Sequence, residues 1–132
     1  MEEKKKILII DDDDDFRKIL NNYLISLGYE TYEAENGLEG FYTMRKKGIL
    51  PDLIILDIIM EELDGIETYN IIKESEEINE IPILFVSGTE IYHKFKEKTG
   101  FKNINFMAKP IQFTILKSLL EKILNKKSKK RK

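Results

Sequence analysis

Strand-length segments alternate five times with segments of helical periodicity along this 132-residue chain. Several of the strand-length segments are apolar almost throughout, which is typical of strands that are buried on both faces of a parallel sheet. Parallel neighbours must be joined by crossovers, and helices supply them. The sequence therefore predicts an α/β domain: a doubly wound, five-stranded parallel sheet with helices on both faces. The expected strands are 6–10, 29–35, 51–57, 81–87 and 104–108.

The expected helices carry apolar residues at steps of three and four, so that each buries one face. The first is expected to bury Phe16, Ile19, Leu20, Tyr23, Leu24 and Leu27 and to end at Gly28. Asn36 is expected to cap the second, over 37–47, which Gly48 stops. The third, over 64–75, is expected to bury Ile66, Tyr69 and Ile72, with Ile71 as a further candidate. A short charged helix follows at 90–100, and the last, at 112–126, is expected to bury Leu116, Leu119, Leu120, Ile123 and Leu124.

Composition excludes several kinds of protein. The chain has no cysteine, so disulfides, thiolate metal sites and cysteine nucleophiles are excluded. No apolar run is long enough to span a membrane, and the N-terminal "MEEKKK" is not followed by the apolar core of a signal peptide. We therefore expect a cytoplasmic protein without a membrane span.

Charge is distributed unevenly along the chain. Residues 126–132 hold six of the 22 lysines and arginines, which leaves sixteen against 24 acidic residues elsewhere and a formal charge of −8 for that part. We expect a single domain over 1–125 and a basic C-terminal tail over 126–132. The tail is expected to be a solvated end, with weak binding to nucleic acid or an acidic surface as the alternative.

Polar residues follow the expected strands at their carboxyl ends, where sites form in open parallel sheets. Asp11 and Asp12 follow the first strand, while Asp57, Ser87 and Lys109 stand at the ends of the third, fourth and fifth. Three carboxylates need a counter-charge, and an oxygen-rich site without cysteine suits Mg²⁺. An aspartate beside a metal, a lysine and a hydroxyl can act as a nucleophile towards phosphorus. The pattern therefore indicates an aspartyl-phosphate site.

Four segments carry a resemblance to the receiver domain of response regulators in two-component signalling. They are "ILIIDDD", "PDLIILDIIMEELDGIE", "IPILFVSG" and "FMAKPI", and the resemblance extends over residues 5 to about 125. It implies a flavodoxin-like (βα)5 fold with strand order 2-1-3-4-5.

The resemblance also implies the roles of the acidic residues. Asp57 would be the phosphoryl acceptor and thus the modified residue. Asp12 and Asp57 would bind Mg²⁺ directly and Asp11 partly through water, and the backbone carbonyl of Ile59 would complete the protein ligands.

The remaining roles concern the phosphoryl group and its signal. Ser87 and Lys109 would each contact a phosphoryl oxygen, and the Lys109–Pro110 peptide bond would be cis. Phe106 falls at the position of a switch aromatic, which would turn inward as Ser87 is drawn towards the phosphoryl group. An ordinary core aromatic is the alternative for Phe106.

The sequence departs from the family pattern at several positions. Glu61 replaces a usual proline, Gly88 replaces a usual alanine, and Ser87 replaces the commoner threonine. Ile59 and Thr89 flank the path of an attacking water, and the side chain of Ile59 cannot orient one. We therefore expect slow self-dephosphorylation.

The function implied is that of a phospho-accepting receiver. The phosphoryl group would come from a phosphohistidine on a sensor histidine kinase or a phosphotransfer protein. The output would be a protein target on the face formed by the fourth helix, fifth strand and fifth helix. We expect no enzymatic activity beyond the chain's own phosphorylation and slow hydrolysis, no dedicated DNA-binding domain, and a monomer or a weak phosphorylation-dependent dimer.

Two other readings remain open. A receiver-shaped interaction module would work without phosphate. A small phosphohydrolase with an aspartate nucleophile would use the Asp-x-Asp pattern within "DDDDD", although 132 residues leave little room for a cap domain.

The five consecutive aspartates divide between site and helix. Asp11 and Asp12 are expected to bind Mg²⁺, and Asp13 to continue the loop and support the site electrostatically. Asp14 and Asp15 are expected in the first turn of a helix, where the helix dipole favours carboxylates.

Overall fold

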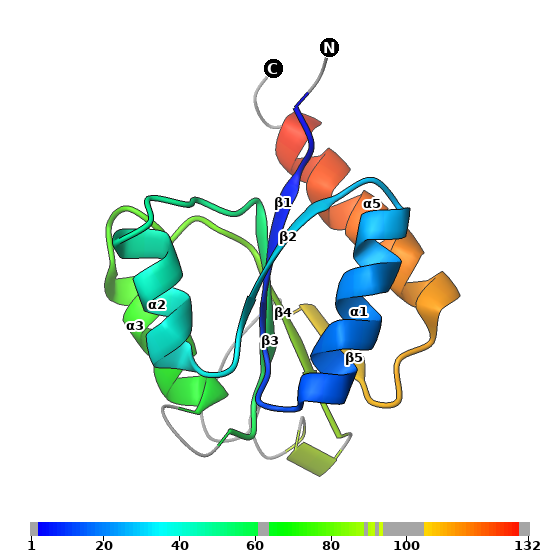
Figure 1. Cartoon of the computed structure of the whole chain (residues 1–132), viewed down its shortest axis with the longest axis horizontal. Coiled ribbons are helices and arrows are strands. Elements are labelled where there is room, and N and C mark those ends of the chain that lie inside the picture. Colours follow the sequence, from blue (N-terminus) through cyan, green and yellow to red (C-terminus); the bar gives the residue numbers. More distant parts are fainter. Residues whose placement is uncertain (1–2, 61–63, 89, 92, 94–104, 130–132) are drawn as a thin grey trace.

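A computed structural model describes residues 3–60, 64–88, 90, 91, 93 and 105–129 (Figure 1). Its elements are β1 (Lys6–Ile10), α1 (Asp14–Ser26), β2 (Glu30–Ala34), α2 (Gly37–Arg45), β3 (Leu53–Asp57), α3 (Gly65–Glu74), β4 (Ile83–Ser87), β5 (Asn105–Ala108) and α5 (Phe113–Lys129). The five strands pair in parallel in the order β2-β1-β3-β4-β5. The predicted fold class and strand order are therefore confirmed.

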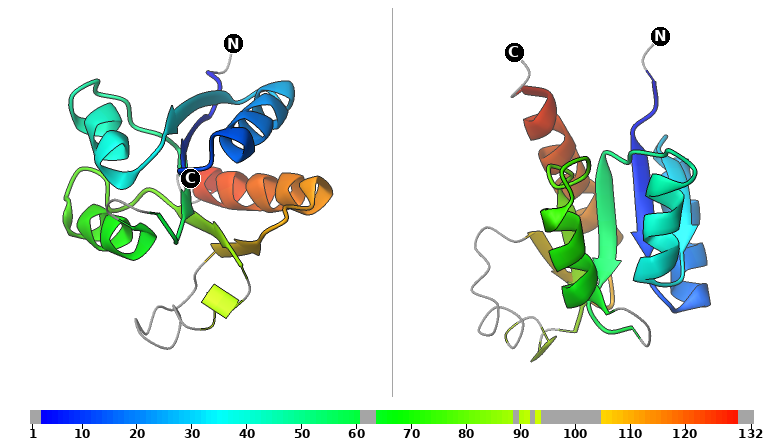
Figure 2. Two further views of the ribbon diagram at one scale, coloured as in Figure 1. Left: turned by 60° about the horizontal axis from the view of Figure 1, so that its bottom comes forward. Right: turned by 90° about the vertical axis from the view of Figure 1, so that its left-hand side faces the viewer.

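Helices cover both faces of the sheet: α1 and α5 lie on one face, and α2 and α3 on the other (Figures 1 and 2). Alternate residues of each strand point to opposite faces, so the apolar strands feed two separate cores. The α1–α5 core consists of Ile7, Ile9, Leu20, Leu24, Leu53, Ile55, Leu84, Val86, Met107, Leu116, Leu120 and Leu124. The α2–α3 core consists of Leu8, Ile10, Ala34, Met44, Ile54, Leu56, Ile58, Met60, Ile72, Ile78, Ile81, Ile83 and Phe85.

Two of the residues expected to face inward are exposed. Ile19 on α1 is 58% exposed and Ile71 on α3 is 41% exposed. Each directly precedes a buried residue of the same helix, and neighbouring side chains point about 100° apart because a turn holds ~3.6 residues. The assignment of these two residues to the core was therefore wrong. The buried stripes of α1 and α3 are narrower than the apolar pattern suggested.

Two predicted helix limits, at Gly28 and Asn36, agree with the local backbone. Gly28 has a positive φ of 97° and follows the last turn of α1. Asn36 caps α2 by accepting a hydrogen bond from the backbone nitrogen of Glu39. The helix ends at Arg45, two residues earlier than predicted, and Gly48 adopts a φ of 67° in the turn that follows.

The C-terminal helix α5 continues to Lys129, so the basic segment that begins at residue 126 starts within a helix. The division of the chain at residue 125 stays a prediction. Most of the helix expected at 90–100 lies outside the described residues. Among the helices that the structure describes, none has the length and apolar character needed to cross a membrane.

A close backbone contact joins α3 to the end of β3. The backbone nitrogen of Gly65 donates a hydrogen bond to the carbonyl oxygen of Ile58 at 2.8 Å. A Cβ atom on Gly65 would lie only 2.5 Å from the Cα of Ile58. The absence of a side chain at Gly65 thus allows α3 to start directly against the residues that follow the strand.

Candidate functional site

The carboxyl ends of four strands meet at one edge of the sheet and bring the predicted polar residues together. Asp57 and Ser87 are the last residues of β3 and β4, Asp11 directly follows β1, and Lys109 directly follows β5. The strand register keeps these ends level, with Asp57 beside Val86 and Ser87 beside Ala108. Positions that lie far apart in the sequence therefore share one small region.

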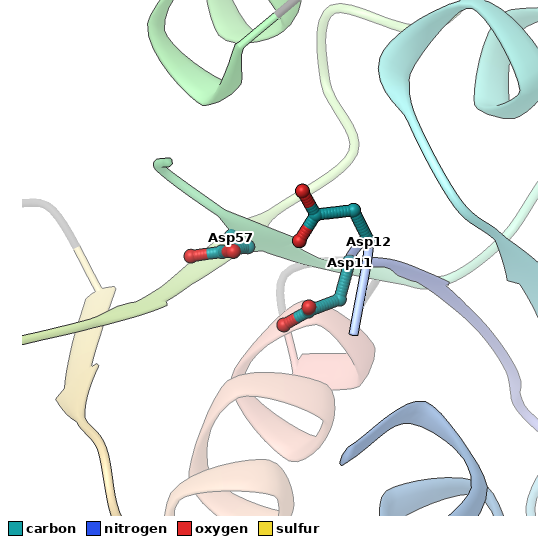
Figure 3. A group of neighbouring side chains, drawn as sticks. All are labelled: Asp11, Asp12 and Asp57. Carbon is teal, nitrogen blue, oxygen red and sulfur yellow. The ribbon is translucent and has the colours of Figure 1, made fainter. Parts of the chain in front are cut away.

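Three carboxylates converge within this region. Asp11, Asp12 and Asp57 each offer an oxygen, and these oxygens all lie within 4.8 Å of one another (Figure 3). Asp11 is only 2% exposed and Asp57 6% exposed, whereas Asp12 is exposed. The cluster thus has a buried floor formed by two carboxylates and one side that is open to solvent.

Lys109 supplies positive charge to the buried part of the cluster. Its Nζ lies 2.9 Å from Oδ2 of Asp11 and 3.8 Å from Oδ2 of Asp57. The same ammonium group lies 4.3 Å from the centroid of the Phe16 ring, which is a cation–π distance. The Lys109–Pro110 peptide bond is cis, as the resemblance implied.

The surroundings of Asp57 favour its protonated form. Burial, followed by the nearby Asp11 carboxylate, raises the pKa of Asp57 to about 7, and Asp12 acts in the same direction. Lys109 and the backbone nitrogen of Ile59, 3.4 Å from Oδ1 of Asp57, oppose this rise. One lysine therefore does not fully offset the three carboxylates.

The donor set fits a hard divalent cation. All three side chains offer carboxylate oxygens, and the exposed Asp12 leaves room for ligands from solvent, which Mg²⁺ usually retains. A cation there would favour the ionised form of Asp57. The amide of Ile59 lies at the site, while a ligand role for its carbonyl oxygen stays a prediction.

The residues predicted to respond to a phosphoryl group lie on β4 and β5. Ser87 is 5% exposed, and its carbonyl oxygen accepts a hydrogen bond from the backbone nitrogen of Lys109 at 3.0 Å. Phe106 pairs with Phe85 across the two strands and packs, partly buried, against the α2–α3 core. A backbone hydrogen bond thus joins the end of β4 to the residue that follows β5, the strand that carries Phe106.

Two departures from the family pattern, Glu61 and Thr89, lie outside the described residues. Ile59, by contrast, is described: its side chain is 57% exposed, two residues beyond Asp57. The residue two positions beyond Asp57 therefore exposes an apolar side chain to solvent.

The structure gives Asp13 a more specific role than the sequence suggested. Asp13 is the N-cap of α1, and its Oδ1 accepts a hydrogen bond from the backbone nitrogen of Phe16 at 3.1 Å. Asp14 and Asp15 lie in the first turn of the helix, as predicted. The signal that could have identified the cap is an aspartate directly before the first turn of the predicted helix.

Sequence reasoning also missed Arg17, which lies on α1 next to the cluster. Its Nη1 donates to the backbone oxygen of Asp11 at 2.6 Å, and its Nη2 donates to Oδ1 of Asp14 at 2.6 Å. Its Nε donates to Oε1 of Glu33, at 3.3 Å. The available signal was a basic residue two positions after the last of five consecutive aspartates.

Comparison with known proteins finds a family for the chain. The sequence profile of the response regulator receiver domain matches residues 7–121. The polar-differentiation response regulator DivK of Brucella anthropi is 34% identical over 71 residues, which cover 54% of this chain and 56% of DivK. The probable transcriptional regulator ycf29 of Porphyra purpurea is 31% identical over 116 residues, which cover 84% of this chain and 52% of the relative.

A third relative is much longer than this chain. The 3',5'-cyclic-nucleotide phosphodiesterase regA of Dictyostelium discoideum is 31% identical over 109 residues, which cover 82% of this chain and 14% of the relative. The chain thus spans between 14% and 56% of the length of these three curated relatives.

Solved structures show the same architecture. A putative response regulator from Chloroflexus aurantiacus superposes with a TM-score of 0.82 at 27% identity, covering 93% of this chain and 99% of that one. The chemotaxis protein CheY4 of Vibrio cholerae superposes with a TM-score of 0.80 at 24% identity, covering 92% of this chain and 100% of that one. The second likeness concerns the fold alone.

Proposed function

Because the chain belongs to the response regulator receiver family, we propose that it accepts a phosphoryl group on Asp57 with the help of Mg²⁺ and signals through a protein partner. The observation that carries the proposal is the convergence of three carboxylate oxygens within 4.8 Å, with Lys109 beside them. The donor would be a phosphohistidine on a sensor histidine kinase or on a phosphotransfer protein.

The reaction uses the carboxylate of Asp57 as the nucleophile. A new bond forms between an oxygen of Asp57 and phosphorus while the bond from phosphorus to the histidine nitrogen breaks, and that nitrogen keeps the electron pair. Asp57 must be ionised to attack, yet burial and Asp11 raise its pKa to about 7. Mg²⁺, held by Asp11, Asp12, Asp57 and the carbonyl of Ile59, would supply the missing positive charge.

The other site residues stabilise charge on the transferred group. The Lys109 ammonium, 3.8 Å from Asp57, can pair with a phosphoryl oxygen once one is attached there. The Ser87 hydroxyl, from the end of the neighbouring strand β4, can donate a hydrogen bond to another.

Signalling follows from the position of Ser87 relative to Phe106. Movement of Ser87 towards the phosphoryl group would shift the end of β4 and change the packing of Phe106 on β5. A protein target on the face formed by the fourth helix, β5 and α5 would then prefer one of the two states. The proposal includes a cytoplasmic location, and a monomer or weak phosphorylation-dependent dimer.

The proposal is limited to signalling. Receiver domains in general are signalling modules rather than enzymes, and the phosphodiesterase activity in the name of regA belongs to a protein of which this chain matches 14%. Beyond its own phosphorylation and slow hydrolysis, no catalytic activity is proposed for this chain.

The test is exposure to acetyl phosphate with Mg²⁺, followed by intact-mass measurement. The wild type should gain the mass of one phosphoryl group, and Asp57→Asn should gain none. Asp15→Asn is the matched control, because Asp15 is an exposed aspartate in the first turn of α1. It should be phosphorylated like the wild type.

The same experiment separates the alternatives. A wild type that binds Mg²⁺ but gains no phosphoryl mass would favour a receiver-shaped module that works without phosphate. A protein that releases inorganic phosphate continuously from acetyl phosphate, at many turnovers per minute, would favour a phosphohydrolase.

A further inference from the structure

The guanidinium group of Arg17 forms hydrogen bonds that hold the loop carrying Asp11 and Asp12. The Arg17 side chain is only 13% exposed, and its donors contact three separate segments. Nη1 contacts the backbone oxygen of Asp11, Nη2 contacts Asp14 on α1, and Nε contacts Glu33 on β2. The planar donor fork of arginine is suited to such a set of contacts, because several bonds form from one rigid group.

The contact between Arg17 and Asp11 lies at the carboxyl end of β1. The backbone nitrogen of Asp11 still donates to Ala34 of β2 at 3.1 Å, so Asp11 is the point where the chain leaves the sheet. Its carbonyl oxygen accepts the short, charge-assisted bond from Arg17. A buried carbonyl at a strand end needs a partner of this kind, and Arg17 provides it.

The rest of the loop is held by bonds on either side of Asp12. The backbone nitrogen of Asp13 donates to Oδ1 of Asp11 at 2.9 Å, and Asp13 in turn caps α1. Asp12 therefore lies between two fixed residues. Its exposed side chain takes its direction from the loop backbone, which Arg17 holds at Asp11.

We propose that Arg17 is a positioning residue for the divalent-cation site. By holding the Asp11 carbonyl and the first turn of α1, it sets where the carboxylates of Asp11 and Asp12 meet that of Asp57. The inference rests on the proposed function, because it takes the acidic cluster to be a Mg²⁺ site. Arg17 does not contact the cation and acts only through the loop.

The direction in which Mg²⁺ affinity changes when Arg17 is removed distinguishes a positioning role from a purely electrostatic one. A fixed positive charge near an acidic cluster repels a cation, so removal of Arg17 should strengthen Mg²⁺ binding if charge alone matters. If Arg17 positions the ligands, its removal should instead weaken binding. Loss of an outer partner of a metal ligand typically costs about 10–100-fold in affinity.

The test measures Mg²⁺ affinity by calorimetric titration and the free energy of unfolding in urea for the same proteins. Arg17→Met retains much of the apolar stem and should weaken Mg²⁺ binding by about tenfold or more. Lys18→Met removes an exposed cation from the next position of α1 and should leave Mg²⁺ affinity unchanged or slightly stronger. Asp12→Ala removes a ligand of the proposed site, and its loss of Mg²⁺ affinity is the reference with which the loss in Arg17→Met is compared.

Two further variants separate a positioning role from a role in stability alone. Glu33→Gln loses the charged partner of Arg17 on β2 but leaves the bond to Asp11, so Mg²⁺ affinity should be kept even where stability falls. Arg17→Lys keeps the charge but lacks the fork, so Mg²⁺ binding should weaken even where the protein is fully folded. This variant decides the matter if Arg17→Met does not fold.

Two results would overturn the inference, and they differ in scope. Folded Arg17→Met or Arg17→Lys with wild-type or tighter Mg²⁺ binding would refute the role of Arg17 alone. A folded wild type that binds no Mg²⁺ would refute the metal site of the proposed function, and the positioning role with it.

Discussion

The proton held by Asp57 links the chemistry of the site to the stability of the protein. Burial and the Asp11 carboxylate raise the pKa of Asp57 from 3.8 to about 7. A carboxyl group whose pKa is higher in the folded state contributes stability that is fully present below its unfolded pKa. That contribution is lost as the pH rises through about 7. Without a cation, the protein therefore loses stability from this group between these two pKa values.

We predict that Asp57→Asn removes most of this pH dependence. In urea unfolding with a chelator present, the free energy of unfolding of the wild type should fall, relative to Asp57→Asn, from about pH 4 to about pH 7. Added Mg²⁺ should stabilise the wild type increasingly over the same range, because it binds the ionised form. Parallel curves for the two proteins would show that the pKa of Asp57 is not raised.

Ile59, two residues beyond Asp57, is expected to flank the path of a water molecule that attacks the phosphorylated side chain. The side chain is 57% exposed and can neither donate nor accept a hydrogen bond. We predict that Ile59→Asn shortens the lifetime of the aspartyl-phosphate by about tenfold, equivalent to roughly 1.4 kcal/mol in the activation barrier. The decay of phosphoprotein after removal of the donor is the measurement.

The matched control for Ile59→Asn is Ile115→Asn. Ile115 is an isoleucine on α5 with a similar exposure of 52%. It lies six residues after Lys109 in the sequence. Its replacement should leave the lifetime unchanged. An unchanged lifetime in Ile59→Asn as well would mean that this side chain does not limit hydrolysis.

Individual site residues were predictable to different degrees. Asp57, Ser87 and Lys109 could be placed together at one sheet edge, because each ends or directly follows a predicted strand and the topology brings strand ends together. Arg17 and Phe16 could not, because their contacts with Asp11 and Lys109 depend on how the first turn of α1 is oriented above the sheet edge. Strand alternation does not encode that orientation.

Two helical glycines differ in what surrounds them, and this difference predicts how the helices tolerate alanine. A Cβ on Gly65 would meet backbone atoms of Asp57 and Ile58, which cannot move without shifting the end of β3. A Cβ on Gly40 of α2 would meet Cδ1 of Ile10 at 2.6 Å, which is the far end of a flexible side chain. Alanine is favoured over glycine by about 1 kcal/mol in a helix interior. This gain can offset the contact at Gly40, but it does not apply to Gly65, which is the first residue of α3.

We predict that Gly65→Ala destabilises the protein by about 2 kcal/mol or more and weakens Mg²⁺ binding, because it displaces the strand end that carries Asp57. Gly40→Ala should cost less and leave Mg²⁺ affinity unchanged. Urea unfolding and calorimetric titration of both variants are the measurements. Equal losses of stability, with Mg²⁺ affinity kept in Gly65→Ala, would contradict this account of the α3–β3 contact.

The helix limits at Gly28 and Asn36 were easier to predict than the buried faces of the helices. Gly28 and Asn36 act through local backbone geometry, so the sequence around them is sufficient. Ile19 and Ile71 are apolar but exposed, because the width of a buried stripe depends on how closely the helix lies on the sheet. That distance is a tertiary property, and a single helix does not specify it.

The two cores give the molecule a rigid frame around one reactive edge. Apolar side chains from β1, β3 and β4 fill both faces of the sheet, so the strands that carry Asp57 and Ser87 are fixed from two sides. The pattern of apolar runs was sufficient to predict this arrangement, since parallel strands buried on both faces allow few architectures. We therefore expect a structural change caused by a bound phosphoryl group to extend mainly to β4 and β5, the strands that carry Ser87 and Phe106.

We predict that Ser87 is required for this change but not for binding at the site. With Mg²⁺ and beryllofluoride as a phosphoryl mimic, amide resonances of Phe106 and Ala108 should shift in the wild type. In Ser87→Ala they should shift much less, because no hydroxyl is drawn towards the bound group, although resonances near Asp57 still respond. Two-dimensional amide spectra of isotope-labelled protein are the measurement.

The control for Ser87→Ala is Ser118→Ala, which removes an exposed hydroxyl from α5. It should reproduce the wild-type shifts at Phe106 and Ala108. Full shifts at these two residues in Ser87→Ala would mean that the signal reaches β5 by another route. The backbone hydrogen bond from Lys109 to Ser87 would then be the first alternative, because it joins the same strand ends without the hydroxyl.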